Sequence, residues 1–232
     1  MIKMNTYKNK NWWQRNLLPH LLILLSLTSC TKDAYEKGEG KYSLMRGDFA
    51  EAIVNSSKQV TGIITDDGDE FTLTAPYTAK WVTTADTTYR CMLYYNKMAD
   101  KAEVLLMGQV PCVGVTPLSK FDRHLVTDPV KFESTWMSKS GRYLNLSLLL
   151  KTGITDDSTA VQSLAIVSDT VITQPDNKRI RHLILHHDQA NVPEYYSTQV
   201  YISIPTQRID ADSVRISINS YSGEVEAKHR IR

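Results

Sequence analysis

Apolar and polar residues alternate along most of the chain after about residue 42, and a period of two predicts β-strands. In DSVRISINSY, Val214, Ile216 and Ile218 alternate with polar residues, so we expect one buried and one solvated face. GRYLNLSLLLK and STQVYISIP repeat this pattern, and Pro205 ends the second of them. Further strands are predicted over 49–55, 60–65, 70–74, 89–96, 130–136, 161–168 and 181–187.

Turn residues divide these strands into two groups. Asp67-Gly68 predicts a tight hairpin, because glycine accepts the positive φ that such a turn requires. NKMADKAEVLLMG is rich in helix-forming residues. We expect a turn in its first half and a strand from Glu103 onward that leads into 110–115. Alternation stops over TPLSKFDRHLVTDP, which predicts a boundary between a small closed barrel and a β-sandwich.

The N-terminal segment has the pattern of a secretory signal. Lys3, Lys8, Lys10 and Arg15 occur without an acidic residue and precede an apolar stretch over 17–29. That stretch is interrupted by Pro19 and is shorter than the roughly 20 residues that a membrane-spanning helix needs. We therefore predict that residues 1–29 are removed from the working protein.

Cys30 is the predicted attachment point to a membrane. Leu27-Thr28-Ser29-Cys30 resembles the lipobox of bacterial lipoproteins, in which the cysteine is lipidated and becomes the first residue. The alternative is an ordinary signal with an incidental cysteine. Two or more acyl chains anchor a protein stably, and the polar residues 30–41 predict a flexible tether. The predicted location is the outer membrane, on either its periplasmic or its surface-facing side.

Removal of residues 1–29 changes the charge of the chain. The formal net charge of +2 becomes −2, because all four charges in the removed segment are positive. A slightly acidic chain without a basic cluster argues against a nucleic-acid partner. Cys91 and Cys112 remain as a candidate disulfide in an oxidising compartment, worth about 3 kcal/mol for a loop of about 20 residues. The alternative is two buried thiols.

The strongest candidate for a metal site is the cluster of His182, His186, His187 and Asp188, because histidine and carboxylate ligands suit zinc. On a strand, however, His182 and His186 face one side and His187 the other. The acidic residues Asp66, Asp67, Asp69 and Glu70 lack the spacing of a calcium loop and fit a solvated hairpin tip. We therefore predict no metal site.

No motif identifies catalytic residues. A nucleophile elbow of the form G-x-S-x-G is absent, and so is a phosphate-binding glycine loop. Neither remaining cysteine lies in a recognisable nucleophile context. The sequence therefore predicts a protein that is not an enzyme and needs no cofactor.

Aromatic residues in the first domain are candidates for ligand binding. Tyr77, Trp81 and Tyr94 lie in a region where small barrels of this type stack bases or sugars. Tyr94 and Tyr95 are adjacent, so only one of them can face the surface. Packing in the core is the alternative for most of these side chains. Tyr195-Tyr196 predicts a second exposed pair in the sandwich.

Several segments together resemble the NigD-like lipoproteins of Gram-negative anaerobes. They are YSLMRGDFAEAIV, TDDGDEFTL, YRCMLYY, WMSKSGRYLNLSL and HLILHHDQANVPEYYSTQVYISIP. The most specific parts are Tyr143-Leu144-Asn145-Leu146 and residues 187–205. The resemblance implies an all-β protein with an OB-like barrel, here 42–120, followed by an immunoglobulin-like β-sandwich, here 121–232. It implies no catalytic residues.

The family takes its name from a bacteriocin-associated gene cluster, so the resemblance implies a role in immunity or envelope protection. We expect a lipoprotein whose partner is a toxin or an envelope protein. The alternative is a glycan-binding accessory lipoprotein that uses the barrel aromatics.

Overall fold

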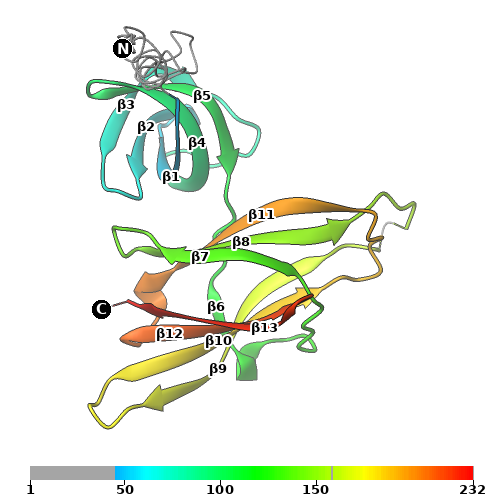
Figure 1. Ribbon diagram of the computed structural model, residues 1–232. Coiled ribbons are helices and arrows are strands. Elements are labelled where there is room, and N and C mark those ends of the chain that lie inside the picture. The colour runs from blue at the N-terminus through cyan, green and yellow to red at the C-terminus, as the bar shows by residue number, and fades with distance from the viewer. Residues whose placement is uncertain (1–44, 158, 232) are drawn as a thin grey trace, which may run out of the picture. The chain divides into compact units, whose positions relative to one another are not determined.

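The computed structural model describes residues 45–157 and 159–231. The predicted signal segment, Cys30 and the predicted tether lie outside these residues. The regular structure of the described chain consists of strands and two short 3-10 turns, Leu118–Lys120 and Thr206–Arg208 (Figure 1). The strands are β1 (Met45–Val54), β2 (Val60–Thr65), β3 (Glu70–Tyr77), β4 (Thr88–Met98), β5 (Lys101–Gln109), β6 (Val115–Pro117), β7 (Lys131–Met137), β8 (Tyr143–Thr152), β9 (Ser163–Thr173), β10 (Arg179–Asp188), β11 (Tyr196–Pro205), β12 (Ser213–Ser220) and β13 (Gly223–Arg230).

The first five strands close into a barrel in the order β1-β2-β3-β5-β4. β1 closes it by pairing with both β2 and β4, while β3 and β5 run parallel. Alternate residues of each strand point inward and form an apolar core that includes Ile63, Phe71, Leu93 and Tyr95. The predicted hairpin after β2 is present, and Gly68 adopts a φ of +90° there. This is the OB-like arrangement expected of the first domain.

The helix-favouring segment after β4 forms a strand pair. β4 continues to Met98, the chain turns at Ala99 and Asp100, and β5 begins at Lys101, two residues before the predicted start at Glu103. Ala99 has a φ of +54° in this turn. Pairing along the barrel wall therefore outweighs the helix propensity of the Ala, Lys and Glu residues, which is weak per residue.

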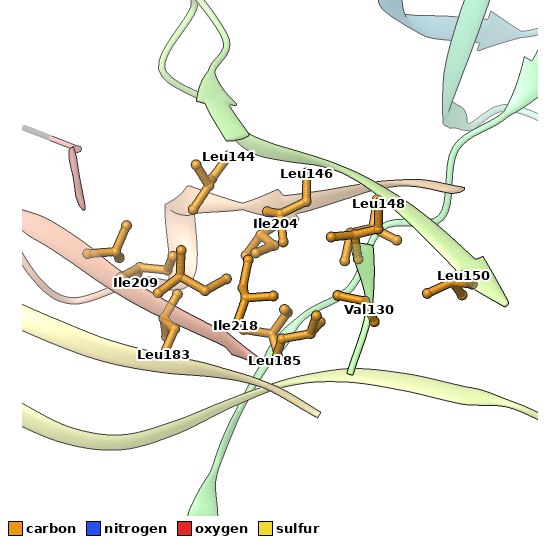
Figure 2. Packing of buried hydrophobic residues seen from close by; sticks show 14 of the residues in the cluster. Val130, Leu144, Leu146, Leu148, Leu150, Leu183, Leu185, Ile204, Ile209 and Ile218 are labelled. Atoms are coloured by element: carbon orange, nitrogen blue, oxygen red, sulfur yellow. The ribbon is translucent and has the colours of Figure 1, made fainter. Parts of the chain in front are cut away.

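The second domain packs two sheets face to face, with strand orders β13-β12-β10-β9-β6 and β11-β8-β7. Its core consists of the inward-facing residues of both sheets. Figure 2 shows Leu144, Leu146 and Leu148 of β8 facing Leu183 and Leu185 of β10 across the interior. The predicted burial of the alternating leucines of β8 is therefore confirmed, because every second side chain of the strand enters the core.

The sandwich begins earlier than the predicted boundary at residue 120. β6 pairs in parallel with β9, so Val115 already belongs to the five-stranded sheet. The connection between the domains is therefore the segment between Gln109 and Val115. The all-β prediction is confirmed. Within residues 45–157 and 159–231, no helix has the length and apolar content to cross a membrane.

Candidate functional site

The three predicted binding aromatics do not form one platform. Tyr77 and Trp81 pack partly buried against the barrel core, and Trp81 meets the Tyr89 ring edge-on with centroids 5.6 Å apart. Tyr95 is buried in the core, so Tyr94 is on the outer face of β4, beside Gly47. Tyr94 therefore faces away from Tyr77 and Trp81, which weakens the geometric case for a glycan site in the barrel.

The Tyr89 hydroxyl is held by hydrogen bonds to the turn that follows Trp81. It accepts hydrogen bonds from the backbone N–H groups of Thr83 at 3.1 Å and Thr84 at 2.9 Å, and lies 3.2 Å from Thr83 Oγ1. These bonds, led by those with Thr83 and Thr84, favour the phenolate and lower the pKa of Tyr89 to about 8. These hydrogen bonds therefore hold the turn after Trp81 against β4.

The three clustered histidines have separate partners. His182 lies between Asp169 at 2.9 Å and Ser217 at 3.0 Å, and the Nδ1 atom of His187 lies 3.0 Å from the carbonyl oxygen of Asp128. His186 is buried on the opposite face of β10 from His187 and packs edge-on against Phe121. In the part of the chain that the structure describes, no three His, Cys, Asp or Glu side chains converge as a metal site would require.

The acidic side chains of the hairpin tip also have different partners. Asp67 pairs with Lys139 at 2.7 Å, and Asp69 with Lys97 at 3.5 Å, both at the surface. Asp66 instead points into the molecule. The cluster that the sequence suggested as an alternative calcium site is therefore dispersed.

Cys91 and Cys112 do not form the candidate disulfide, because both are free thiols in the structure. Cys91 is inside the barrel, where its thiol donates to the carbonyl oxygen of Ala50 at 3.4 Å. Cys112 lies exposed on the connection between the domains. Desolvation raises the pKa of Cys91 to about 12, and it also raises the pKa of Cys112.

We expect the two thiols to differ in accessibility. In the folded protein, iodoacetamide should modify Cys112 but leave Cys91 unmodified, because the barrel core excludes the reagent. Both should react in urea. Peptide mapping by mass spectrometry of labelled, non-reduced protein measures this directly. A peptide cross-linked through Cys91 and Cys112 would show that the disulfide forms after all.

A buried polar cluster joins the barrel to the sandwich, and we call Asp66, Arg90, Asn145 and Ser203 the polar junction. Arg90 donates from Nη1 and Nη2 to the two carboxylate oxygens of Asp66, at 2.7 and 2.6 Å. Its Nε donates to Ser203 Oγ at 3.1 Å, and Nη2 also donates to Asn145 Oδ1 at 3.2 Å. Arg90 is 4% exposed, and Asn145 and Ser203 are fully buried.

The remaining polar atoms of the junction are also satisfied. Asn145 Nδ2 donates to Asp66 Oδ2 at 3.1 Å, and the Ser203 hydroxyl donates to Asn145 Oδ1 at 2.7 Å. The Arg90 guanidinium lies 4.2 Å from the centroid of the Tyr143 ring. A buried charge is tolerated only when it is paired and hydrogen-bonded, and this cluster meets that condition.

Glu51 and aromatic rings border the polar junction. Glu51 of β1 accepts hydrogen bonds from Arg142 at 2.9 Å and from the Tyr143 hydroxyl at 2.6 Å. Desolvation, and then the bond to Glu51, raise the pKa of Tyr143 well above its usual value. The Phe49 ring meets Trp136 and Tyr201 edge-on, each at 5.3 Å. These residues therefore belong to the same interface between the barrel and the sandwich.

We expect His186 to make the stability of the sandwich dependent on pH. The N–H of Val126 donates to its Nδ1 at 3.1 Å, which requires that nitrogen to be unprotonated. Desolvation by burial lowers the pKa of His186, while the Asp188 carboxylate opposes this shift. The folded protein therefore holds His186 neutral at a pH where the unfolded chain begins to bind a proton.

As the pH falls below about 6.5, the unfolded chain gains this proton first, so we expect the free energy of unfolding to decrease. The slope contributed by one such histidine is at most about 1.4 kcal/mol per pH unit. In urea titrations between pH 6.5 and 5, His186→Asn should reduce the slope of the free energy of unfolding against pH. His229, whose pKa is also lowered by burial, should account for part of the slope that remains. An unchanged slope in the variant would contradict this assignment.

Exposed apolar side chains gather at one end of the sandwich, and we call this surface the apolar end. Its members are Ile154, Val161, Tyr195, Tyr196 and Tyr221. Ile154 is 83% exposed and Tyr195 is 78% exposed. Ile154 and Val161 come from the connection after β8, Tyr195 from the connection before β11, and Tyr221 from the turn after β12, while Tyr196 is the first residue of β11.

Contacts hold the connections of the apolar end together. The Tyr195 ring lies so close to Gly153 that a Cβ there would come within 2.8 Å of it. The Tyr221 hydroxyl donates to Glu194 Oε2 at 3.3 Å. Tyr196 stands opposite Thr152 in the β11–β8 pair. The predicted exposed pair Tyr195-Tyr196 is therefore part of a larger surface.

The fold and the junction together define a two-domain, all-β protein without a recognisable catalytic centre in its described part. The model of the NigD-like C-terminal β-sandwich domain matches residues 113–230, which span both sheets of the sandwich. The chain belongs to the NigD-like family. A search of curated proteins found no match.

Solved structures support the same fold. A NigD-like immunity protein from Bacteroides caccae is 19% identical, with a TM-score of 0.63 over 80% of this chain and 97% of its own. A protein described as toxin-related from Parabacteroides distasonis is 14% identical, with a TM-score of 0.59 over 80% and 92%. A candidate lipoprotein from Bacteroides fragilis is 12% identical, with a TM-score of 0.56 over 81% and 98%. At these identities the likeness establishes the fold alone.

Proposed function

We propose that this protein is a non-enzymatic lipoprotein of the cell envelope that binds another macromolecule through the apolar end of its sandwich. The proposed partner is a toxin or an envelope protein, and the proposed role is immunity or envelope protection. The observation that carries the proposal is the gathering of exposed Ile, Val and Tyr side chains on one surface.

The chemistry of the apolar end suits a protein partner. Contiguous exposed apolar side chains on a soluble domain mark interaction sites, and tyrosine is enriched where proteins bind one another. The surface combines three tyrosines with two aliphatic residues and a polar border that includes Glu194. The immunity and toxin-related descriptions belong to the structural neighbours, and they support this class of partner without identifying it.

The test is a crosslinking pull-down of the full-length tagged protein from intact cells. It compares the wild type with a variant carrying Ile154→Ser and Tyr195→Ser. A matched control carries Met98→Ser and Leu106→Ser, which remove two exposed apolar side chains of the barrel. We expect one partner to be enriched with the wild type and the control and lost with the variant. Identical proteins in all three samples, or none in any, would reject the proposal.

The same pull-down, with and without protease added outside the cells, reports which side of the outer membrane the protein occupies. The immunity role has its own test. A deletion strain should become more sensitive to a bacteriocin, and restoration should require the intact apolar end. Unchanged sensitivity across a bacteriocin panel would remove the immunity role while leaving the binding proposal in place.

Anchoring through Cys30 is a separate expectation. Cys30→Ser removes the thiol that would carry the lipid, so the variant should incorporate no radiolabelled palmitate and should leave the membrane fraction. The wild type provides the labelled control. Full palmitate incorporation by the variant would refute the assignment.

A further inference from the structure

β11 is an edge strand whose free side is only partly covered. In the three-stranded sheet it pairs with β8 alone. At Ser203 the connection between the domains covers the other side. The N–H of Ser203 donates to the carbonyl oxygen of Pro111 at 3.0 Å, and the N–H of Val113 donates to the Ser203 carbonyl oxygen at 2.9 Å. An extended segment therefore already lies along this edge, as a parallel bridge between Cys112 and Ser203.

The uncovered part of the edge lies before Ser203. Backbone N–H and C=O groups of a strand point alternately to its two sides, so those of Ser197, Gln199 and Tyr201 face the same way as those of Ser203. The described part of the chain offers these groups no backbone partner. Residues 196–199 are also exposed. Up to three N–H and three C=O groups are thus available to an incoming strand.

The other three edge strands of the sandwich are protected. β6 is three residues long and ends in Pro117. β7 has a bulge between Phe132 and Ser134, and β13 carries charges at alternate positions. β11 instead has ten residues without a charge, and its pairing with β8 is free of register shifts. Charges, bulges and short length are among the devices that prevent edge pairing, and β11 has none of these three; its proline, Pro205, lies beyond the part of the edge that is already covered at Ser203.

A hollow of about 390 Å³ adjoins this edge at the apolar end, between β8 and β11 on one side and the connections that carry Val161 and Val192 on the other. Thr198 and Val200 of β11 form one wall, and Val161 and Gln162 form part of another. None of the residues that line it carries a charge. A strand added beside β11 would direct alternate side chains toward this hollow, which would accept apolar side chains of moderate size.

We propose that β11 between Ser197 and Tyr201 is a strand-addition site for an extended, uncharged segment of the partner protein. Main-chain hydrogen bonds to the edge would supply affinity, and apolar side chains entering the hollow would supply selectivity. The segment would continue the ladder that Pro111 and Val113 begin at Ser203. This inference rests on the proposed function and specifies how the macromolecular partner is held.

The test measures binding of a fluorescent peptide to the full-length protein in detergent by anisotropy. The probe is a synthetic peptide of alternating Thr and Val with a lysine at each end. Ser197→Pro removes one outward N–H and leaves the β8 ladder intact, because proline is tolerated on an edge strand when its nitrogen faces outward. Ser197→Thr keeps the N–H and is the matched control.

We expect Ser197→Pro to weaken binding about tenfold relative to Ser197→Thr, as the loss of one hydrogen bond predicts. A probe that is N-methylated at alternate residues should fail to bind the wild type, and this result requires no variant to fold. Equal binding by Ser197→Pro and Ser197→Thr, equal binding of the methylated probe, or no binding at millimolar peptide would overturn the proposal. A wild-type dimer that becomes monomeric in Ser197→Pro would identify a second copy as the occupant and would also overturn it.

The strand-addition proposal and the proposed function fail separately. If Ser197→Pro still captures the partner in the pull-down, strand addition is rejected and macromolecular binding stands. If the wild type captures no partner, the proposed function is rejected, whatever the peptide does.

Discussion

Arg90→Ala should lower the free energy of unfolding by about 3–5 kcal/mol, because it leaves the Asp66 carboxylate without its buried counter-ion. The side chains of Arg90 and Asp66 are 1% and 15% exposed, so water can replace little of what the guanidinium provides. Asn145 and Ser203 would lose their bonds to the guanidinium at the same time. Urea denaturation followed by circular dichroism measures the change.

The matched control is Arg123→Ala. Arg123 lies 4.0 Å from Asp122, and both side chains are exposed, so its removal should have little effect. A double variant, Arg90→Met with Asp66→Leu, should recover much of the lost stability, because it removes both charges instead of one. If Arg90→Ala were as mild as Arg123→Ala, the polar junction would not hold in solution.

Leu146→Ala should cost about 2–5 kcal/mol, because the side chain is fully buried between the two sheets of the sandwich. The cost combines the lost burial of the methyl groups with the cavity left behind. Leu149→Ala is the matched control on the same strand, since its side chain faces the opposite side and is only partly buried. Equal losses of stability in thermal and urea unfolding would contradict the assignment of the two faces of β8.

The strands were largely predictable because alternation records which residues enter a core. Val214, Ile216 and Ile218 are all fully buried, as their spacing predicts. Propensity was less informative at the β4–β5 turn, where the helix-forming composition conflicts with the barrel. The domain boundary was placed too late because β6 has three residues, which is too short for a periodic pattern to appear.

The polar junction was not predictable from alternation alone. The polar face of a strand is expected to be solvated, yet Asn145 and Ser203 are fully buried because the barrel covers that face of the three-stranded sheet. Alternation assigns residues to faces but does not say what covers each face. The available signal was an asparagine between two leucines in Tyr143-Leu144-Asn145-Leu146, one of the most specific parts of the family resemblance.

Every segment that carries the resemblance contributes to the contact between the domains. Phe49 and Glu51 come from the first segment, Asp66 from the second and Arg90 from the third. The fourth supplies Tyr143 and Asn145, and the last supplies Ser203. The segments that identify the family in this chain therefore maintain the two-domain architecture, and the last of them also supplies Tyr195 and Tyr196 of the apolar end.

In-cell photocrosslinking can show whether the apolar end of the sandwich binds a macromolecule. A photoreactive benzoylphenylalanine replaces Tyr195 in one full-length protein and Leu106, an exposed barrel residue, in another. We expect a discrete crosslinked species of higher mass from position 195 and none from position 106. No crosslink at 195, or the same pattern from both positions, would contradict this expectation.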